Sequence, residues 1–154
     1  MSTVKEAEAQ ANAGYLIWRL ASRWRAAVDR EVAPLGLTHA QYSLLASLYG
    51  LSRGGARPSQ RELADFTGLD PIYVSKLARA LERAGFVIRV THPADPRAVQ
   101  LSLTDYGVEI VLKAVRVVHA LHERLTRPLG GSRGARTAEL IDMLRQLLNE
   151  PDPQ

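Results

Sequence analysis

The first half of the chain alternates amphipathic helical stripes with residues that end helices. Between residues 12 and 32, apolar side chains recur at steps of three and four, a spacing that predicts a helix with one buried face. This stripe consists of Ile17, Leu20, Ala21, Trp24, Ala27, Val28 and Val32. Pro34 and Gly36 follow it and end the helix. Thr38 and Gln41 have the spacing of a capping box and predict a second helix to about residue 51.

A second pair of helices is predicted between residues 59 and 84. Ser59 and Glu62 repeat the capping-box spacing and open a short helix to about residue 66, and Gly68 breaks it. Asp70 followed by Pro71 supplies an N-cap and a proline at the first helical position, so a new helix begins there. Its buried stripe consists of Val74, Leu77, Ala78 and Leu81.

After residue 85 the apolar spacing changes from the helical period to a period of two. This alternation predicts a β-hairpin with strands at residues 86–90 and 99–103. Its tip, residues 92–97, contains Pro93 and Pro96, which have no N–H to donate to a strand ladder. The tip is therefore expected to project as a loop.

Two further helices are predicted at the end of the chain. The first runs from the cap Thr104 to about residue 126, and its apolar side chains cover more than one face, so it needs partners on two sides. The second follows the glycine-rich stretch 130–134 and ends at Asn149. The fold class expected is mainly α with a small β-hairpin.

The order helix, tight turn, helix and hairpin is that of a winged helix-turn-helix, which we place at residues 38–103. In that motif the second helix lies in the major groove of DNA and the wing reaches the backbone or minor groove. The predicted DNA-binding residues are Ser59, Gln60, Pro71, Ile72, Tyr73, Ser75, Lys76, Arg79, Asp95 and Arg97.

These side chains carry the chemistry that DNA contacts need. Tyr73 and Ser75 can donate hydrogen bonds to bases or phosphates, Lys76 and Arg79 are cations, and Ile72 can pack on a thymine methyl.

The wing carries the other predicted contact. Arg97, at the tip of the hairpin, is expected to enter a minor groove, with Asp95 orienting its guanidinium.

The helices at residues 12–33 and 105–149 are expected to hold a homodimer. They show more apolar surface than a small winged module can cover. A twofold dimer would place two recognition helices about 34 Å apart, one turn of double-stranded DNA.

Charge favours a polyanionic partner only weakly. The 20 basic and 16 acidic side chains give a net charge of +4. Residues 57–97 contain seven basic and five acidic side chains, a net charge of +2. This modest charge leaves open a second function, that of a winged-helix protein-interaction module without DNA binding.

Several classes of function are disfavoured. The chain has no cysteine, which excludes thiolate metal sites and thiol redox switches. No arrangement of nucleophile, base and oxyanion donors is visible, so neither an enzyme nor a cofactor is expected. His119 and His122 are three residues apart and could share a metal, although a surface or interface position fits them better.

No apolar run is long enough for a membrane span and the first residues do not resemble a signal peptide, so a cytoplasmic protein is expected.

Between residues 60 and 107 the motifs also fall in the order of a known family. They are Leu63-Ala64, Gly68-Leu69, Val74-Ser75-Lys76-Leu77, Leu81-Glu82, Gly85-Phe86-Val87, Arg89, Asp95-Pro96-Arg97-Ala98, Leu101-Ser102-Leu103-Thr104 and Gly107. The chain thereby resembles the MarR family of bacterial transcriptional regulators, and the flanking helices are similar in length and place.

The resemblance implies a homodimer on a pseudo-palindrome, repression in most members, and a ligand crevice between the dimerisation and DNA-binding regions. Pro96 departs from the arginine that many relatives have there, so only Arg97 is carried over as the wing arginine. A small aromatic or amphipathic effector is the expected ligand, if one is used.

Three residues are candidates for that crevice. Trp18, His39 and Tyr42 lie where the first two helices are expected to pack, a neighbourhood that lines the crevice in resembling proteins. Ordinary core packing explains these positions equally well. Trp24 lies on the apolar stripe itself and is expected in the core rather than in a ligand wall.

Overall fold

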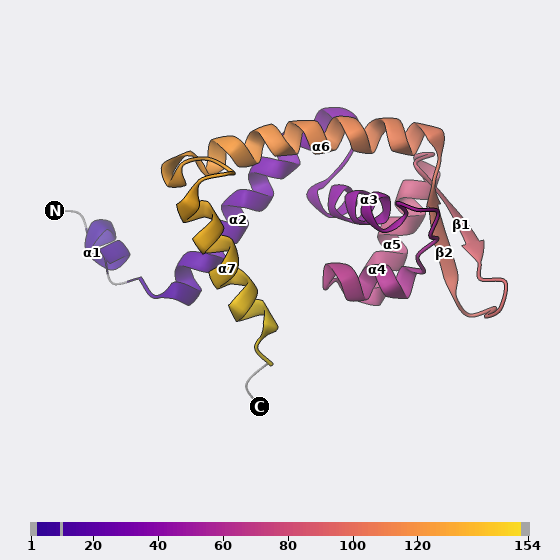
Figure 1. Ribbon diagram of the computed structural model, residues 1–154, viewed down its shortest axis with the longest axis horizontal. Helices are drawn as coiled ribbons and strands as arrows, with labels where there is room; N and C mark the ends of the chain where they lie inside the picture. The colour runs from indigo at the N-terminus through magenta and orange to yellow at the C-terminus, as the bar shows by residue number, and fades with distance from the viewer. Residues whose placement is uncertain (1–2, 10, 152–154) are drawn as a thin grey trace.

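The computed structural model describes residues 3–9 and 11–151. Its elements are α1 (Thr3–Ala9), α2 (Ala13–Val32), η1 (Ala33–Leu35), α3 (His39–Leu51), α4 (Gln60–Thr67), α5 (Pro71–Arg83), β1 (Val87–Thr91), β2 (Val99–Leu103), α6 (Asp105–Leu125), η2 (Arg127–Leu129) and α7 (Ala135–Asn149). The helix α6 runs along the long axis, with α2 and α7 descending from one end and α3, α4, α5 and the hairpin gathered at the other (Figure 1).

Local side-chain caps fix where the central helices begin. Thr38 Oγ1 accepts the Gln41 N–H at 3.2 Å while Gln41 Oε1 accepts the Thr38 N–H at 3.0 Å, which is a complete capping box. Ser59 and Glu62 make the same reciprocal pair at the start of α4, at 3.1 and 2.7 Å. Both predicted capping boxes are therefore confirmed.

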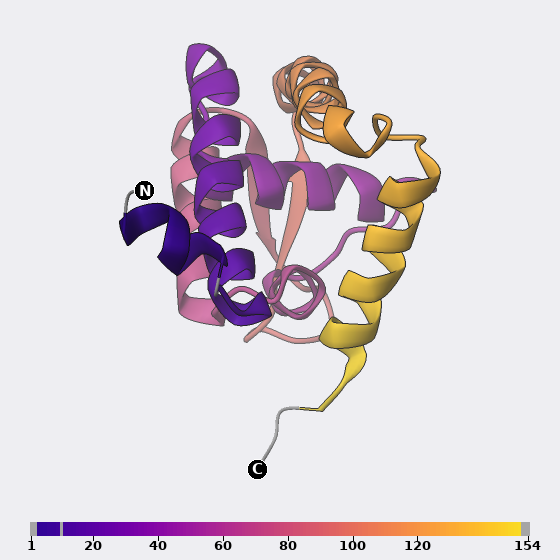
Figure 2. The ribbon, with the colours of Figure 1, turned by 90° about the vertical axis from the view of Figure 1, so that its left-hand side faces the viewer.

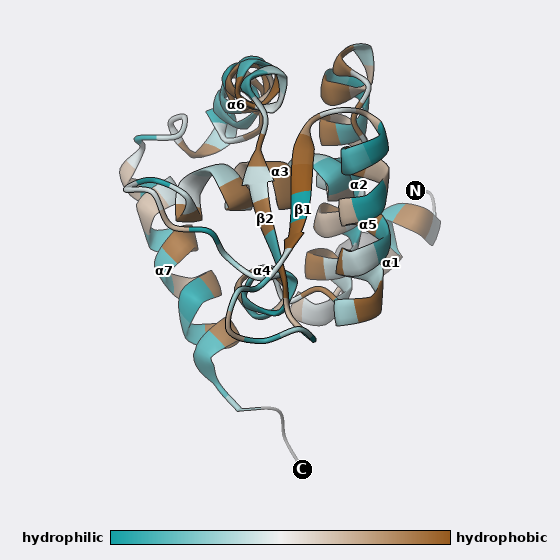
Figure 3. Cartoon of the chain, turned by 90° about the vertical axis from the view of Figure 1, so that its right-hand side faces the viewer, coloured by the Kyte–Doolittle hydropathy of each residue, from teal (hydrophilic) through white to brown (hydrophobic). Residues whose placement is uncertain are grey.

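The two strands form one antiparallel hairpin in which Val87 lies opposite Leu103. The first strand begins one residue later than predicted, because the Phe86 N–H donates to the Leu81 carbonyl and continues the turn after α5. The short segment of Pro58 and Ser59 pairs with the edge of β2 that faces away from β1. The Leu101 N–H donates to the Pro58 carbonyl at 3.0 Å, and Ser59 forms an isolated antiparallel β-bridge with Gln100. Both strands cross in front of α3 and α4 (Figure 3).

One apolar core joins the winged module to the inner halves of α2 and α6. It contains the fully buried side chains Leu44, Leu45, Leu48, Leu63, Leu81, Leu101, Val28, Val32, Val74, Val111 and Val118. The helix α6 packs against α2 and α3, as its two apolar faces predicted. None of the described helices combines the length and apolarity that crossing a membrane requires.

The outer ends of α2 and α7 leave this core. Of the predicted stripe on α2, only Ala27, Val28 and Val32 are buried in the single chain, whereas Ile17 and Leu20 are 44% and 46% exposed. In α7 only Thr137 is buried. The two helices run down opposite sides of this end of the molecule (Figure 2).

Candidate nucleic-acid interface

The helix α5 is held at its start by Asp70. One carboxylate oxygen, Oδ1, accepts the N–H groups of Ile72 at 2.9 Å and Tyr73 at 3.1 Å. These are two of the N–H groups that a helix start leaves without a partner. The predicted inner stripe of α5 is buried, so the orientation of the helix about its axis is fixed by the core.

The outer face of α5 brings together five of the six DNA-binding residues predicted on this helix, here called its reading residues. A shallow groove of about 580 Å³ is lined by Pro71, Ile72, Ser75, Lys76, Arg79 and Arg83. Ile72 is 82% exposed, which leaves its whole side chain free for an apolar contact. Arg83, which is not among the predicted DNA-binding residues, lines the same groove.

The cations of this face form no ion pair with any described residue. In the part of the chain that the structure describes, no carboxylate lies within 4.0 Å of Lys76, Arg79 or Arg83. Because no acidic side chain neutralises it, the face presents an uncompensated positive charge to solvent.

Tyr73 lies apart from the other five reading residues of α5. It is 43% exposed and lines a separate cleft between α2, α3 and α5. Its N–H is engaged by Asp70. Tyr73 therefore connects the start of the recognition helix to that cleft.

At the start of α4 the two predicted residues are already engaged. The Ser59 hydroxyl oxygen caps the helix by accepting the Glu62 N–H. The Gln60 side-chain oxygen, Oε1, accepts a hydrogen bond from Arg89 Nε at 3.2 Å. The sequence analysis named Arg89 only as a motif residue and did not predict its contact with Gln60, because the two residues are 29 positions apart and no local spacing relates them.

The wing tip is a folded turn. The His92 N–H donates to the Ala98 carbonyl at 2.8 Å, and His92 Nδ1 accepts the Ala94 N–H at 3.0 Å. Asp95 Oδ1 accepts the backbone N–H of Arg97 at 3.0 Å. The prediction that Asp95 orients the guanidinium is corrected here, because its carboxylate holds the backbone of Arg97. The Arg97 side chain itself is exposed.

Of the three candidate ligand residues, only His39 lines the cleft beside α5. This cleft has a volume of about 420 Å³ and is lined by Arg25, Asp29, Thr38, His39, Ala40, Ser43, Thr67, Leu69 and Tyr73. The backbone N–H of His39 donates to Asp29 Oδ1 at 2.5 Å. Burial lowers the pKa of the His39 imidazole, opposed in part by Asp29.

The other two candidates lie elsewhere. Tyr42 packs against the core, and burial raises the pKa of its phenol. Trp18 is 66% exposed and stacks with Tyr15 at 6.3 Å between ring centroids. It precedes Asp29 by eleven helical positions, about 16 Å along α2. The structure therefore keeps His39 and Tyr42 one turn apart on α3 but does not bring Trp18 to them.

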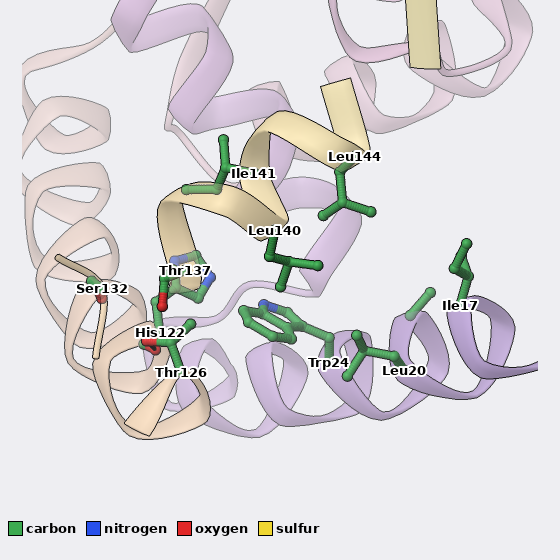
Figure 4. A pocket seen from close by; sticks show the side chains of 11 residues that line it. Ile17, Leu20, Trp24, His122, Thr126, Ser132, Thr137, Leu140, Ile141 and Leu144 are labelled. Carbon is green, nitrogen blue, oxygen red and sulfur yellow. Dashed lines mark hydrogen bonds between the residues drawn. The ribbon is translucent and has the colours of Figure 1, made fainter. Parts of the chain in front are cut away.

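A second cavity, almost wholly apolar, lies between α2, the end of α6 and α7 (Figure 4). Its volume is about 430 Å³ and its lining is Ile17, Leu20, Ala21, Trp24, His122, Thr126, Ser132, Thr137, Leu140, Ile141 and Leu144. Trp24 was expected in the core, but it is only half-buried and forms a wall of this cavity.

The ring of Trp24 meets His122, with 5.4 Å between ring centroids. Burial lowers the pKa of His122, and the neighbouring His119 lowers it further. Among the described residues, no cluster of three or more histidine, aspartate or glutamate side chains could hold a metal, so His119 and His122 belong to no such cluster.

Comparison with known proteins identifies the architecture. Residues 37–99 match the MarR family. The uncharacterized HTH-type transcriptional regulator YdcH of Bacillus subtilis (strain 168) is 36% identical over 110 residues, which are 71% of this chain and 75% of that protein. The transcriptional repressor CouR, bound to a 23-mer DNA duplex, is 31% identical with a TM-score of 0.79 over 97% of this chain and 99% of that chain. A mutant MarR from E. coli, complexed with operator DNA, is 27% identical with a TM-score of 0.76 over 88% of this chain and 92% of that chain.

Proposed function

Because this chain belongs to the MarR family of DNA-binding transcriptional regulators, we propose that it is a homodimeric repressor that a small molecule releases from its operator. Each subunit reads one half of a pseudo-palindromic site, with α5 in a major groove and the hairpin at the flanking minor groove. A regulator of this kind would bind DNA in the cytoplasm. It would catalyse no reaction and need no cofactor.

The uncompensated positive face of α5 is the observation that carries this proposal. Lys76 and Arg79 project from the same face as Ser75 and the exposed Ile72, so cations, a hydroxyl and an apolar group meet one groove. Arg97 projects from the wing tip. A winged helix that binds only protein would not require cations, a hydroxyl and an apolar group on one exposed face. Membership of a family of DNA-binding regulators also disfavours that alternative.

The apolar outer ends of α2 and α7 support the homodimer. Exposed apolar side chains are concentrated there: Tyr15, Leu16, Ile17, Trp18, Leu20, Ile141, Met143, Leu144, Leu147 and Leu148. A monomer in water does not leave so many large apolar groups exposed on two helices without a partner. A second copy of the chain would cover them across a twofold axis.

The cleft beside α5 supports the release step. It combines the cation of Arg25 with His39 and the hydroxyl of Ser43, which suits a small aromatic or amphipathic molecule bearing an acidic or hydroxyl group. Tyr73 lines the cleft from α5 itself. A ligand seated there would contact both α2 and the recognition helix and could change their relative position.

The proposal is tested by fluorescence anisotropy with the DNA upstream of the protein's own gene and a scrambled duplex of equal length, each at two salt concentrations. Arg79→Ala and Arg97→Ala are each expected to weaken specific binding by about tenfold, because each removes a charged contact to DNA. The dimer, measured by light scattering, should remain intact.

Arg145→Ala serves as the matched control, since Arg145 is an exposed arginine on α7 that does not line the groove of α5. Its removal should leave operator affinity unchanged. Unaltered affinity in both Arg79→Ala and Arg97→Ala would show that the reading surface has been assigned wrongly.

A further inference from the structure

Arg89 joins three parts of the winged module. It lies in the middle of β1, opposite Leu101, and its side chain is 21% exposed. Its Nε donates to Gln60 Oε1, on the first residue of α4, at 3.2 Å. Its Nη1 lies 3.5 Å from Glu82 Oε2, near the end of α5. The guanidinium is therefore held by both helices of the helix-turn-helix.

This contact decides which way the Gln60 amide faces. A carboxamide has one oxygen that accepts and one NH₂ that donates, whereas a guanidinium can only donate. With the oxygen of Gln60 engaged by Arg89, the NH₂ group has no acceptor among the described residues and is left to donate elsewhere. Exchange of the two amide ends would set NH₂ against the guanidinium donor and lose the hydrogen bond.

We propose that Arg89 is a positioning residue for operator binding: it holds Gln60 so that the amide NH₂ donates to a DNA backbone phosphate. This inference rests on the proposed function. Gln60 is the residue that touches DNA, and Arg89 acts through it. Glu82 keeps the guanidinium in place by pairing with its far end.

Gln60→Glu tests the contact, because the two roles of Gln60 respond oppositely to it. A glutamate at position 60 still accepts from Arg89, as a charge-assisted pair, so the melting temperature should hold or rise. It has no NH₂ and sets a negative charge against the phosphate, so operator affinity should fall about tenfold or more. Gln146→Glu is the matched control, since it adds the same charge on the exposed polar face of α7 and should not alter binding.

A double-mutant cycle tests the role of Arg89. Arg89→Met alone should weaken operator binding about three- to tenfold, and Arg89→Lys, which keeps a donor, should lose less. In the Gln60→Ala background Arg89→Met should cause no further loss. The salt dependence of binding should keep its slope in Arg89→Met, because Arg89 itself releases no counter-ion from DNA.

The outcomes separate the possibilities. Additive losses with a salt slope smaller by about one unit would mean that Arg89 contacts phosphate directly, and would overturn the proposal. Variants that lose thermal stability but bind the operator as tightly as the parent would reduce Arg89 to a structural role and also overturn it. Absence of operator binding by the parent protein would instead count against the proposed function, independently of any variant.

Discussion

Position 107 must be glycine, because the first turn of α6 lies directly on the backbone of Phe86. A Cβ added to Gly107 would overlap the Phe86 carbonyl oxygen and lie 2.9 Å from the carbonyl carbon. That same oxygen accepts the Thr104 N–H at 3.1 Å, which ties the start of α6 to the turn after α5. The contact is thus between two stretches of backbone, and neither can move aside without breaking this hydrogen bond.

Gly107→Ala is expected to lower the free energy of unfolding by about 1–3 kcal/mol, the usual cost of overpacking. Urea unfolding followed by circular dichroism would measure it. Gly50→Ala is the control, since Gly50 lies in α3 with open space around its Cα. There alanine should be neutral or slightly stabilising, because it favours helix over glycine. Equal stability of Gly107→Ala and the parent would contradict the close approach.

His122 is expected to make stability depend on pH. Its folded-state pKa lies below the ordinary histidine value of 6.5, because the imidazole is partly buried against Trp24 and next to His119. The folded state therefore binds fewer protons than the unfolded state. The contribution of His122 to the free energy of unfolding is therefore fully present above about pH 6.5 and is lost as the pH drops below it.

His122→Phe keeps a ring against Trp24 and removes the titration. Urea unfolding at about pH 7.5 and about pH 5.5 should show a smaller acid loss in this variant than in the parent. The loss does not vanish, because the pKa of His39 is also lowered by burial and acts in the same direction. An acid loss equal to that of the parent would rule out a contribution from His122.

At the scale of elements, the recognition helix depends on a single side-chain cap. Asp70→Ala removes the acceptor of two N–H groups and should lower the free energy of unfolding by about 1 kcal/mol. The first turn of α5, which carries Ile72, would fray, so operator affinity should also fall. Asp70→Asn caps equally well and should restore both. Thermal unfolding and anisotropy on the same samples would check this, and a full loss in Asp70→Asn would point to the charge instead of the cap.

Sequence alone predicts those elements whose signals are local. Both capping boxes, the Asp70 cap and the alternation of the hairpin act within a few residues, and the structure confirms each. The helix α1 was missed because its sequence, TVKEAEA, has no apolar stripe and its described side chains are exposed. The turns η1 and η2 were missed because each is only three residues long.

The candidate DNA-binding site likewise combines features that local spacing predicts with features that it does not. The reading face of α5 follows from helical periodicity once the buried stripe is known, since the two lie on opposite sides. The pairing of Arg89 with Gln60 and the lining of the cleft by Arg25, Thr67 and Tyr73 join residues far apart in sequence. Such contacts depend on how helices pack, which no spacing along the chain encodes.

At the scale of the whole molecule, the outer ends of α2 and α7 are predicted to form the dimer. Leu147 is 62% exposed in the single chain, so a charge there costs a monomer little. Leu147→Glu should nevertheless convert the dimer to monomers and weaken operator binding by at least about tenfold, because the half-sites would be bound separately. Light scattering and anisotropy would measure the two effects.

The neighbouring residue offers the control for this prediction. Gln146→Glu adds the same charge one position earlier, on the polar side of α7, and should leave the dimer intact. A Leu147→Glu protein that remains dimeric would place the interface elsewhere on the molecule.

The helix α6 connects the two ends of the molecule as one continuous rod. It is a single α-helix of 21 residues, about 30 Å long, rooted between the apolar cavity at one end and the winged module at the other. Tilting a rod of that length by about 5° displaces its far tip by about 3 Å, nearly the rise of one base pair. In the proposed dimer, a small change of angle where the two subunits meet would therefore become a mismatch between the two recognition helices and the pitch of DNA.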